Sequence, residues 1–413
     1  MAFPTRLRLG PSQTFAALKH HNFRLWFIGQ LVSLVGTWMQ VTAQGFLIFQ
    51  LTHSPAYLGY VGFAAGSPSI LFSLFGGVVA DRMPRRTLLV ITQTVMMVLA
   101  FIQAGLTSFQ IIQPWHIVAL AFLNGIATAF DAPSRQAFVL EMVAREDLAN
   151  AIALNSMMFN LATVAGPAAA GLAYALIGAA GCFTLNGLSY IAVIAALLMM
   201  RLGQPALPNR VVGSALADVK EGVRYVAGHP IILTAIGLLG ITSMFAQSVI
   251  TLMPDWAVVI LGGDATTNGL LQSARGLGAL AAALMIASRG QSIPKGRLLT
   301  VGSLAFPVVM LVFAATRWLP FSLAALVGMS WGHMLLINMA NMVVQANTPD
   351  ELRGRVMSIY VLVFFGTAPL GALLTGGLGE LLGTPLTVAF CALAALATSV
   401  LVWLKVPRLR AEG

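Results

Sequence analysis

Five ionisable residues lie within long apolar stretches of the sequence, where a charge is costly and calls for a functional explanation. Asp131 and Arg135 are four residues apart, so their side chains can pair on one helix face, either as a structural clamp or as part of a proton or substrate pathway. Asp255 and Arg275 fall in consecutive apolar stretches and could face each other across a hairpin. His333 could titrate near neutral pH, although we favour a neutral, hydrogen-bonded histidine. These five residues are our candidates for coupling to protons.

Polar side chains also form four rows at helical spacing, each within one apolar stretch. Steps of three, four or seven residues keep each row on a single helix face. In hydrocarbon, such a row is satisfied either by hydrogen bonds between helices or by a polar cavity. The rows are Ser33, Thr37, Gln40 and Gln44; Asn124, Thr128, Asp131 and Arg135; Ser243, Gln247, Thr251 and Asp255; and Trp331, Asn338, Asn341 and Gln345.

The composition places these residues in a membrane. Of the 413 residues 58% are hydrophobic and 9% are charged, against about 25% charged in soluble domains. The net charge of +10 would also suit a nucleic-acid-binding protein, but every Lys and Arg except Arg275 and Arg317 lies at or near one predicted membrane face. We therefore expect the lipid bilayer, and no nucleic acid, as a partner. Cys182 and Cys391 lie in separate apolar stretches and the six histidines are scattered, so we expect no metal site and no cofactor.

Twelve apolar stretches are long enough to cross a bilayer as helices, which requires about 20 residues each. An even number returns the chain to its starting side, and Lys and Arg near both ends predict cytoplasmic termini. The longest polar break predicts an N-terminal bundle at 1–201, a cytoplasmic linker with an amphipathic helix at 202–229, and a C-terminal bundle at 230–413. The stretches are 23–51, 56–80, 87–109, 115–139, 150–176, 180–200, 231–259, 266–288, 298–315, 320–346, 352–379 and 385–404.

A cluster of charge, Gly77 to Arg86, joins the second and third stretches. One acid followed by three arginines predicts a cytoplasmic turn, for which a simple positive-inside anchor is the alternative explanation. The stretch resembles the signature loop between helices 2 and 3 of the major facilitator superfamily, from which Val79 and Pro84 depart. This resemblance implies two pseudo-symmetric six-helix bundles, an all-α membrane fold, and a central cavity lined by the four polar rows. It also implies a gate formed by Gly77, Asp81, Arg82, Arg85 and Arg86, with Arg353 and Arg355 in the second half.

Further motifs are similar to those of the superfamily's exporters. Gly166, Pro167 and Gly171 resemble the antiporter-associated helix-5 motif, although Ala162 and Ala170 stand where glycines are usual. The segments 130–138 and 345–356 are similar to the enterobactin-exporter-like branch of the superfamily. This resemblance implies a monomeric transporter of the bacterial inner membrane that uses alternating access and protons to export amphipathic drugs or a siderophore. The alternatives are a uniporter or symporter for a metabolite and, from other classes, a membrane-embedded enzyme or a receptor.

Overall fold

The computed structural model describes residues 15–201, 215–247, 249–289 and 295–406. Within them, the side chains of 73–78, 80–82, 215–219, 247 and 289 lie outside the description, although their backbone is helical. The part of the chain described here contains helices and no strand, as the sequence predicts. The first half consists of η1 (Ala16–Lys19), α2 (His21–Thr52), α3 (Pro55–Arg82), α4 (Arg85–Ser108), α5 (Pro114–Phe138), η2 (Val139–Glu141), η3 (Arg145–Asp147) and α6 (Leu148–Met199).

The second half begins after the short helix α7 (Ala215–Gly228), which lies where the amphipathic linker helix is predicted. Its seventh apolar stretch is not the single helix that the sequence predicts. The remaining elements are α8 (Pro230–Thr242), η4 (Ser243–Gln247), η5 (Ile250–Leu252), α9 (Met253–Asp255), η6 (Trp256–Ile260), α10 (Ala265–Arg289), α11 (Lys295–Ala315), α12 (Leu319–Ala346), α13 (Asp350–Leu382) and α14 (Thr384–Lys405). Segments η4 and η6 are π-helical turns and η5 is a 3-10 turn. Pro254 contributes to this irregularity, because it has no N–H for the helical hydrogen bond.

Helix α6 is a hairpin of two helices that turns at Gly178. This glycine has a φ of 70°, which a residue with a side chain adopts only with strain. The Cys182 thiol lies 3.9 Å from the Ala170 carbonyl oxygen, whereas 12 residues of straight helix would span about 18 Å. The chain therefore folds back here, between the predicted stretches 150–176 and 180–200.

The surface of the molecule is that of a multi-pass membrane protein. Large apolar side chains are exposed along the outer faces of the helices, with Leu176 73% and Leu381 82% exposed. Such a surface is costly in water and suits hydrocarbon. In the described residues, ten helical segments are long and apolar enough to cross a membrane; one of them is the α6 hairpin, and α3 is not among them. The exact count of twelve spans therefore stays a prediction.

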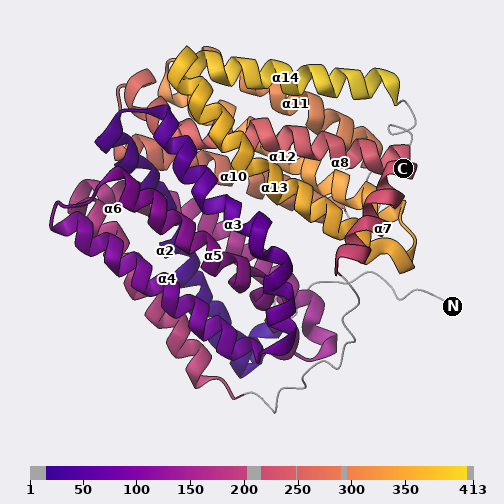
Figure 1. Ribbon diagram of the computed structural model, residues 1–413, viewed down its shortest axis with the longest axis horizontal. Helices are drawn as coiled ribbons and strands as arrows, with labels where there is room; N and C mark the ends of the chain where they lie inside the picture. The colour runs from indigo at the N-terminus through magenta and orange to yellow at the C-terminus, as the bar shows by residue number, and fades with distance from the viewer. Residues whose placement is uncertain (1–14, 202–214, 248, 290–294, 407–413) are drawn as a thin grey trace.

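The helices form two groups that touch along two helix pairs (Figure 1). Helices α2–α6, drawn in indigo to magenta, pack mainly with one another, and α8–α14, drawn in pink to yellow, do the same. Between the groups, α3 packs against α13 and α6 against α10. Both pairs use small residues at the contact, Gly59 with Gly376 and Gly171 with Gly269. The domain boundaries at 201 and 230 stay a prediction.

The close contacts between the groups lie toward one end of the helices, which we name the Ser54 end; the opposite end is the Arg85 end. At the Ser54 end, the Ser54 hydroxyl donates to the Glu380 carboxylate at 2.6 Å, and the Ala56 N–H donates to the same oxygen at 3.3 Å. The start of α3 is thereby bound to α13 of the other group. At the Arg85 end, no ion pair between two described side chains joins the groups. The described contacts between the two halves thus lie mainly toward the Ser54 end.

Candidate functional site

A pocket of about 60 Å³ lies among helices of the first half. Four of its lining residues, Thr37, Gln40, Gln44 and Asn124, come from the polar rows that the sequence predicts on α2 and α5. Two polar residues of α6, Asn186 and Tyr190, complete the polar lining and were not predicted. Their signal is weak, since they form only one four-residue step in an otherwise apolar stretch. The full lining is Thr37, Gln40, Val41, Gln44, Ala65, Ala121, Asn124, Asn186 and Tyr190.

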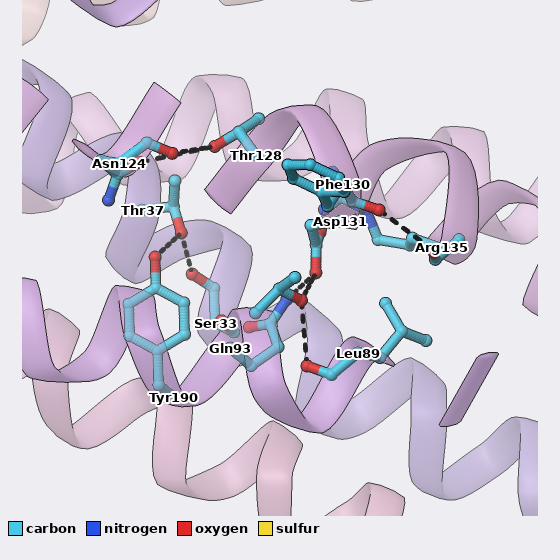
Figure 2. Close-up of polar contacts among 12 residues, drawn as sticks. Ser33, Thr37, Leu89, Gln93, Asn124, Thr128, Phe130, Asp131, Arg135 and Tyr190 are labelled. Carbon is cyan, nitrogen blue, oxygen red and sulfur yellow. Dashed lines mark hydrogen bonds and ion pairs between the residues drawn. The ribbon is translucent and has the colours of Figure 1, made fainter. Parts of the chain in front are cut away.

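Hydrogen bonds between helices connect part of this lining. The Asn186 amide donates to Gln40 Oε1 at 2.6 Å, and the Gln40 amide donates to Gln103 Oε1 on α4 at 3.3 Å. The hydroxyls of Thr37 and Tyr190 lie 3.4 Å apart, as Figure 2 shows. The Thr37 hydroxyl also donates to the Ser33 carbonyl oxygen at 2.9 Å, and Ser33 itself is buried. The row on α2 therefore makes hydrogen bonds between helices and also lines a pocket, so both interpretations of it hold in part.

The row on α5 divides in the same way. Near the pocket, the Thr128 hydroxyl donates to the Asn124 carbonyl oxygen at 2.9 Å (Figure 2). Further along the helix, Asp131 is only 2% exposed and accepts hydrogen bonds from Thr92 and Gln93 of α4, each at 2.9 Å. Arg135 lies 3.5 Å from the other carboxylate oxygen. The predicted pair thus forms inside the first half, where its charge is balanced and it links α4 to α5.

The two polar rows of the second half do not line the pocket, and their members lie in different surroundings. Ser243 is fully buried and its hydroxyl has no hydrogen-bond partner, while the Gln247 side chain lies outside the described part. Thr251 faces α3, since a Cβ added at Gly62 would lie 3.4 Å from its methyl group. On α12, the Asn338 amide donates to the Met334 carbonyl, the Gln345 amide donates to Asn341 at 2.6 Å, and Trp331 is half-buried. Both of these amide bonds stay within α12, and the Asn341 side chain also interacts with the Tyr360 hydroxyl of α13.

The predicted pairing of Asp255 with Arg275 is wrong. No ion pair joins these two described residues, and the Arg275 guanidinium instead donates to Gln272 at 3.2 Å on its own helix. Arg275 lies close enough to His333 for its positive charge to act on the imidazole, whereas Asp255, 6% exposed, lies near the Thr384 side chain and the like-charged Glu380. The physical reason is the irregular helix before Asp255, because its π and 3-10 turns change the rotation per residue on which the predicted face depends.

His333 also differs from its predicted state. Its ring is 9% exposed and packs against Phe306 with 5.2 Å between ring centroids. Its Nε2 atom has no hydrogen-bond partner, so the histidine is buried without the full hydrogen bonding that we expect from the sequence.

The predicted helix-5 motif lies at two close helix contacts. A Cβ at Gly166 would lie 2.4 Å from the Trp38 Cβ on α2, and a Cβ at Gly171 would lie 2.9 Å from the Thr266 Cα on α10. Pro167 places its carbonyl oxygen 2.5 Å from a Cβ added at Gly269. The motif therefore allows α6 to pack tightly against its own half and against the other half.

The predicted gate residues are described only in part. Gly77, Asp81 and Arg82 belong to α3, but their side chains lie outside the described part of the structure. Arg85 pairs with Glu141 at 2.6 Å, and Arg86 donates to the Leu198 carbonyl at 2.7 Å, so both act within the first half.

In the second half, Arg353 pairs with Asp350 in the first turn of α13. Arg355 pairs with Glu221 at 2.9 Å and so binds α13 to the linker helix α7.

One ionic contact outside the spans attaches the start of the chain to α6. The Lys19 ammonium lies 2.7 Å from Asp147, and this hydrogen bond raises the pKa of Lys19. His20 lies 2.7 Å from the same carboxylate oxygen. Among the residues that the structure describes, no group of three or more His, Cys, Asp and Glu side chains could hold a metal ion.

Comparison with solved structures identifies the fold. A bacterial homologue of the human lysosomal transporter Spinster, in an inward-facing and unoccupied conformation, superposes with a TM-score of 0.68 over 98% of this chain and 97% of its own, at 15% identity. A nucleoside transporter superposes with a TM-score of 0.72 over 93% of this chain and 98% of its own, at 13% identity. This chain therefore has the fold of these transporters.

The family follows from the sequence. The chain belongs to the transmembrane secretion effector family of the major facilitator superfamily, whose model matches residues 12–412, so it is a membrane transporter and not an enzyme. It is 26% identical to the multidrug efflux pump Tap of Mycolicibacterium fortuitum, covering 92% of this chain and 94% of that protein. It is 25% identical to the staphyloferrin A transporter of Staphylococcus aureus (87% and 90% covered) and to the enterobactin exporter of Escherichia coli O1:K1 (90% and 88% covered).

Proposed function

We propose that this transporter exports amphipathic small molecules, drugs or a siderophore, by alternating access and in exchange for protons. It acts as a monomer in the bacterial inner membrane with both termini in the cytoplasm. Its functional units are an N-terminal bundle at 1–201, a linker at 202–229 and a C-terminal bundle at 230–413. The second candidate, a uniporter or symporter for a metabolite, uses the same fold and differs in its energy source and direction.

The pocket in the first half is the observation that carries this proposal. Its lining combines amides and hydroxyls, from Gln40, Gln44, Asn124 and Tyr190, with the apolar side chains of Val41 and Ala121. A mixed lining suits a molecule that has both polar and apolar surface. The names of the relatives, a multidrug efflux pump and an enterobactin exporter, support the same class of substrate.

The packing of the two halves supports alternating access. The described contacts hold the halves together at the Ser54 end, and the predicted topology makes this the outer end. With the Ser54 end held together, the proposed cycle has the cytoplasmic end as the one that opens, which is the side from which an exporter takes its substrate. Transport then requires the contacts at the Ser54 end to separate while the Arg85 end closes through residues such as Asp81, Arg82 and Arg355.

Asp131 and Asp255 are the carboxylates that we propose for coupling to protons. Both are buried within the membrane-spanning part, at 2% and 6% exposure. Asp131 is bonded to Thr92, Gln93 and Arg135, so a movement of α4 against α5 would change the stabilisation of its charge. His333 is the third candidate.

Transport by purified protein in liposomes tests the proposal. A pH gradient that is acidic on the side of the Ser54 end should drive accumulation of ethidium, and collapse of the gradient should abolish it. Gln44→Leu, which removes an amide from the pocket, should raise the KM for the dye. Ser358→Ala is a matched control, because this exposed hydroxyl bonds only to the Gly354 carbonyl of its own helix. Equal KM values for wild type and Gln44→Leu would exclude the pocket as the substrate-binding site. Dye movement that does not depend on the pH gradient would favour the uniporter.

A further inference from the structure

The inner face of α10 carries three polar residues that the sequence patterns did not bring together. Asn268, Gln272 and Arg275 follow one another at steps of four and three residues, which places them on one face of this regular helix. The lipid-facing side of α10 is marked by Leu270 and Leu277, which are 43% and 49% exposed. Arg275 lies about 160° around the helix from Leu277, at 100° per residue. The polar row therefore points into the protein.

Among the described side chains, Arg275 has no negatively charged partner. A guanidinium group has five N–H donors, and the described hydrogen bond of this one goes to Gln272 Oε1 at 3.2 Å. No described carboxylate forms an ion pair with it, although the residue is more than half buried. A buried charge is normally paired, because its removal from water without a partner is costly. The simplest explanation is that the anionic partner of Arg275 is part of a ligand and is present only when that ligand is bound.

The neighbours of Arg275 offer further unused hydrogen-bonding groups. Asn268 is 1% exposed, and its side-chain oxygen has no partner. His333 of α12 is 9% exposed, interacts electrostatically with Arg275, and has an Nε2 atom without a partner. Three buried or half-buried polar groups from two helices thus have hydrogen-bonding capacity in excess of what the protein itself uses.

The position of this cluster also suits a ligand. Arg275 is ten residues from the start of α10, a rise of about 15 Å, which is half of a hydrocarbon core of about 30 Å. The adjacent face of α10 contacts the other half of the molecule, where the Ser273 hydroxyl donates to the Val164 carbonyl at 2.8 Å. Substrate sites of such transporters lie near the midplane, between the two repeats.

We propose that Arg275, Gln272, Asn268 and His333 bind a carboxylate or similar anionic oxygen group of the transported molecule. This inference rests on the proposed function and adds to its substrate class: amphipathic molecules with an anionic group bind through Arg275, whereas a cation such as ethidium binds without it. The guanidinium forms a bidentate pair with the anionic group, which adds direction as well as attraction. Asn268 and His333 orient the part of the molecule next to the charge.

Equilibrium binding to the full-length protein in a neutral detergent tests this assignment without a membrane or a gradient. The probes are carboxyfluorescein, an aromatic carboxylate, and ethidium, an aromatic cation, and the readout is the fluorescence anisotropy of the dye. Arg275→Gln should weaken binding of carboxyfluorescein at least about tenfold, the usual loss for a charge-assisted hydrogen bond, and should not weaken binding of ethidium. Arg317→Gln is the control, because this exposed arginine lies outside the proposed site: it donates to backbone carbonyls near the end of α11, and its guanidinium lies 5.7 Å from the centroid of the Trp256 ring.

Unchanged affinity of Arg275→Gln for carboxyfluorescein would overturn the assignment. If sodium sulfate displaces bound carboxyfluorescein at a concentration equal to that of the dye, the site binds inorganic anions. That result would overturn the proposal that the anionic group belongs to the transported molecule. If Arg275→Gln does not fold, phenylglyoxal modification of the wild type decides: protection of Arg275 by carboxyfluorescein, measured by mass spectrometry, supports the site, and equal modification refutes it. Because these are binding measurements, a failure of gradient-driven transport in liposomes would refute the proposed function and leave this result standing.

Discussion

The contact between α3 and α13 predicts that a single methyl group at Gly376 opens the Ser54 end. A Cβ at this position would lie 2.7 Å from the Gly59 Cα, 2.9 Å from the Gly59 nitrogen and 3.0 Å from the Pro55 oxygen. All three atoms belong to the backbone, so no side chain can rotate away. Ordinary carbon contacts are about 3.5–4.0 Å, so the helices would have to separate by about 1 Å.

The size of the effect can be worked out for Gly376→Ala. Overpacking of a close contact costs about 1–3 kcal/mol. The gain in helix propensity from Gly to Ala is about 1 kcal/mol, and it applies to every conformation in which α13 is helical. The packed state therefore loses about 2 kcal/mol relative to a state in which the Ser54 end is apart, which shifts the ratio of the two states about 30-fold.

Spin labels at Phe109 and Leu381 would measure this shift. These residues lie beyond α4 and near the end of α13, and they are 78% and 82% exposed, so labels there disturb little packing. Double electron–electron resonance in nanodiscs should show a longer distance in Gly376→Ala. Gly377→Ala is the matched control, since a Cβ there meets no atom within 4 Å. The reasoning is refuted if Gly376→Ala keeps the wild-type distance, or if both variants shift it equally.

Three further predictions concern charge and topology. Glu380→Gln removes the carboxylate that accepts from Ser54 and faces the start of α3, so the same spin-label pair should report a more open Ser54 end; a wild-type distance would contradict this. Asp131→Asn and Asp255→Asn should each still bind dye but lose accumulation driven by a pH gradient; if both retain it fully, the coupling role of these carboxylates is wrong. A cysteine at Arg85 should react with an impermeant thiol reagent only from the cytoplasmic side, and one at His53 only from outside; the reverse pattern would overturn the predicted orientation.

Most helix positions could be predicted because they depend on the length of the apolar stretches and on the residues, such as Pro and Gly, that begin or end helices. A span needs about 20 apolar residues, and the residues that end or begin helices are visible in the sequence. Pro55 is the first residue of α3, and Gly178, with its positive φ, turns the α6 hairpin between two predicted stretches. Such local signals do not depend on which helices later become neighbours.

The pocket could be predicted only where a polar row was long enough to be recognised. Thr37 and Gln44 belong to a row of four residues, and Asn124 belongs to another, so periodicity identified them. Asn186 and Tyr190 also line the pocket, but they are only two residues, four positions apart, and are too few to be recognised as a row. Their role depends on the packing of α6 against α2, which no periodicity within one helix contains.

The failed pairing of Asp255 with Arg275 has a specific physical cause. Face assignment from spacing assumes a constant rotation per residue, and α10 satisfies this assumption, so Arg275 lies on the same face as Gln272. Asp255 follows the π turn η4 and the 3-10 turn η5. A π turn accommodates about one extra residue and so rotates everything after it by about 100°. The spacing of four that aligned Ser243 with Asp255 therefore carried no information on the direction of this carboxylate. The sequence did predict that Arg275 lies about halfway along a membrane-spanning helix. The anion site is inferred from this position together with the lack of a paired acid among the described side chains.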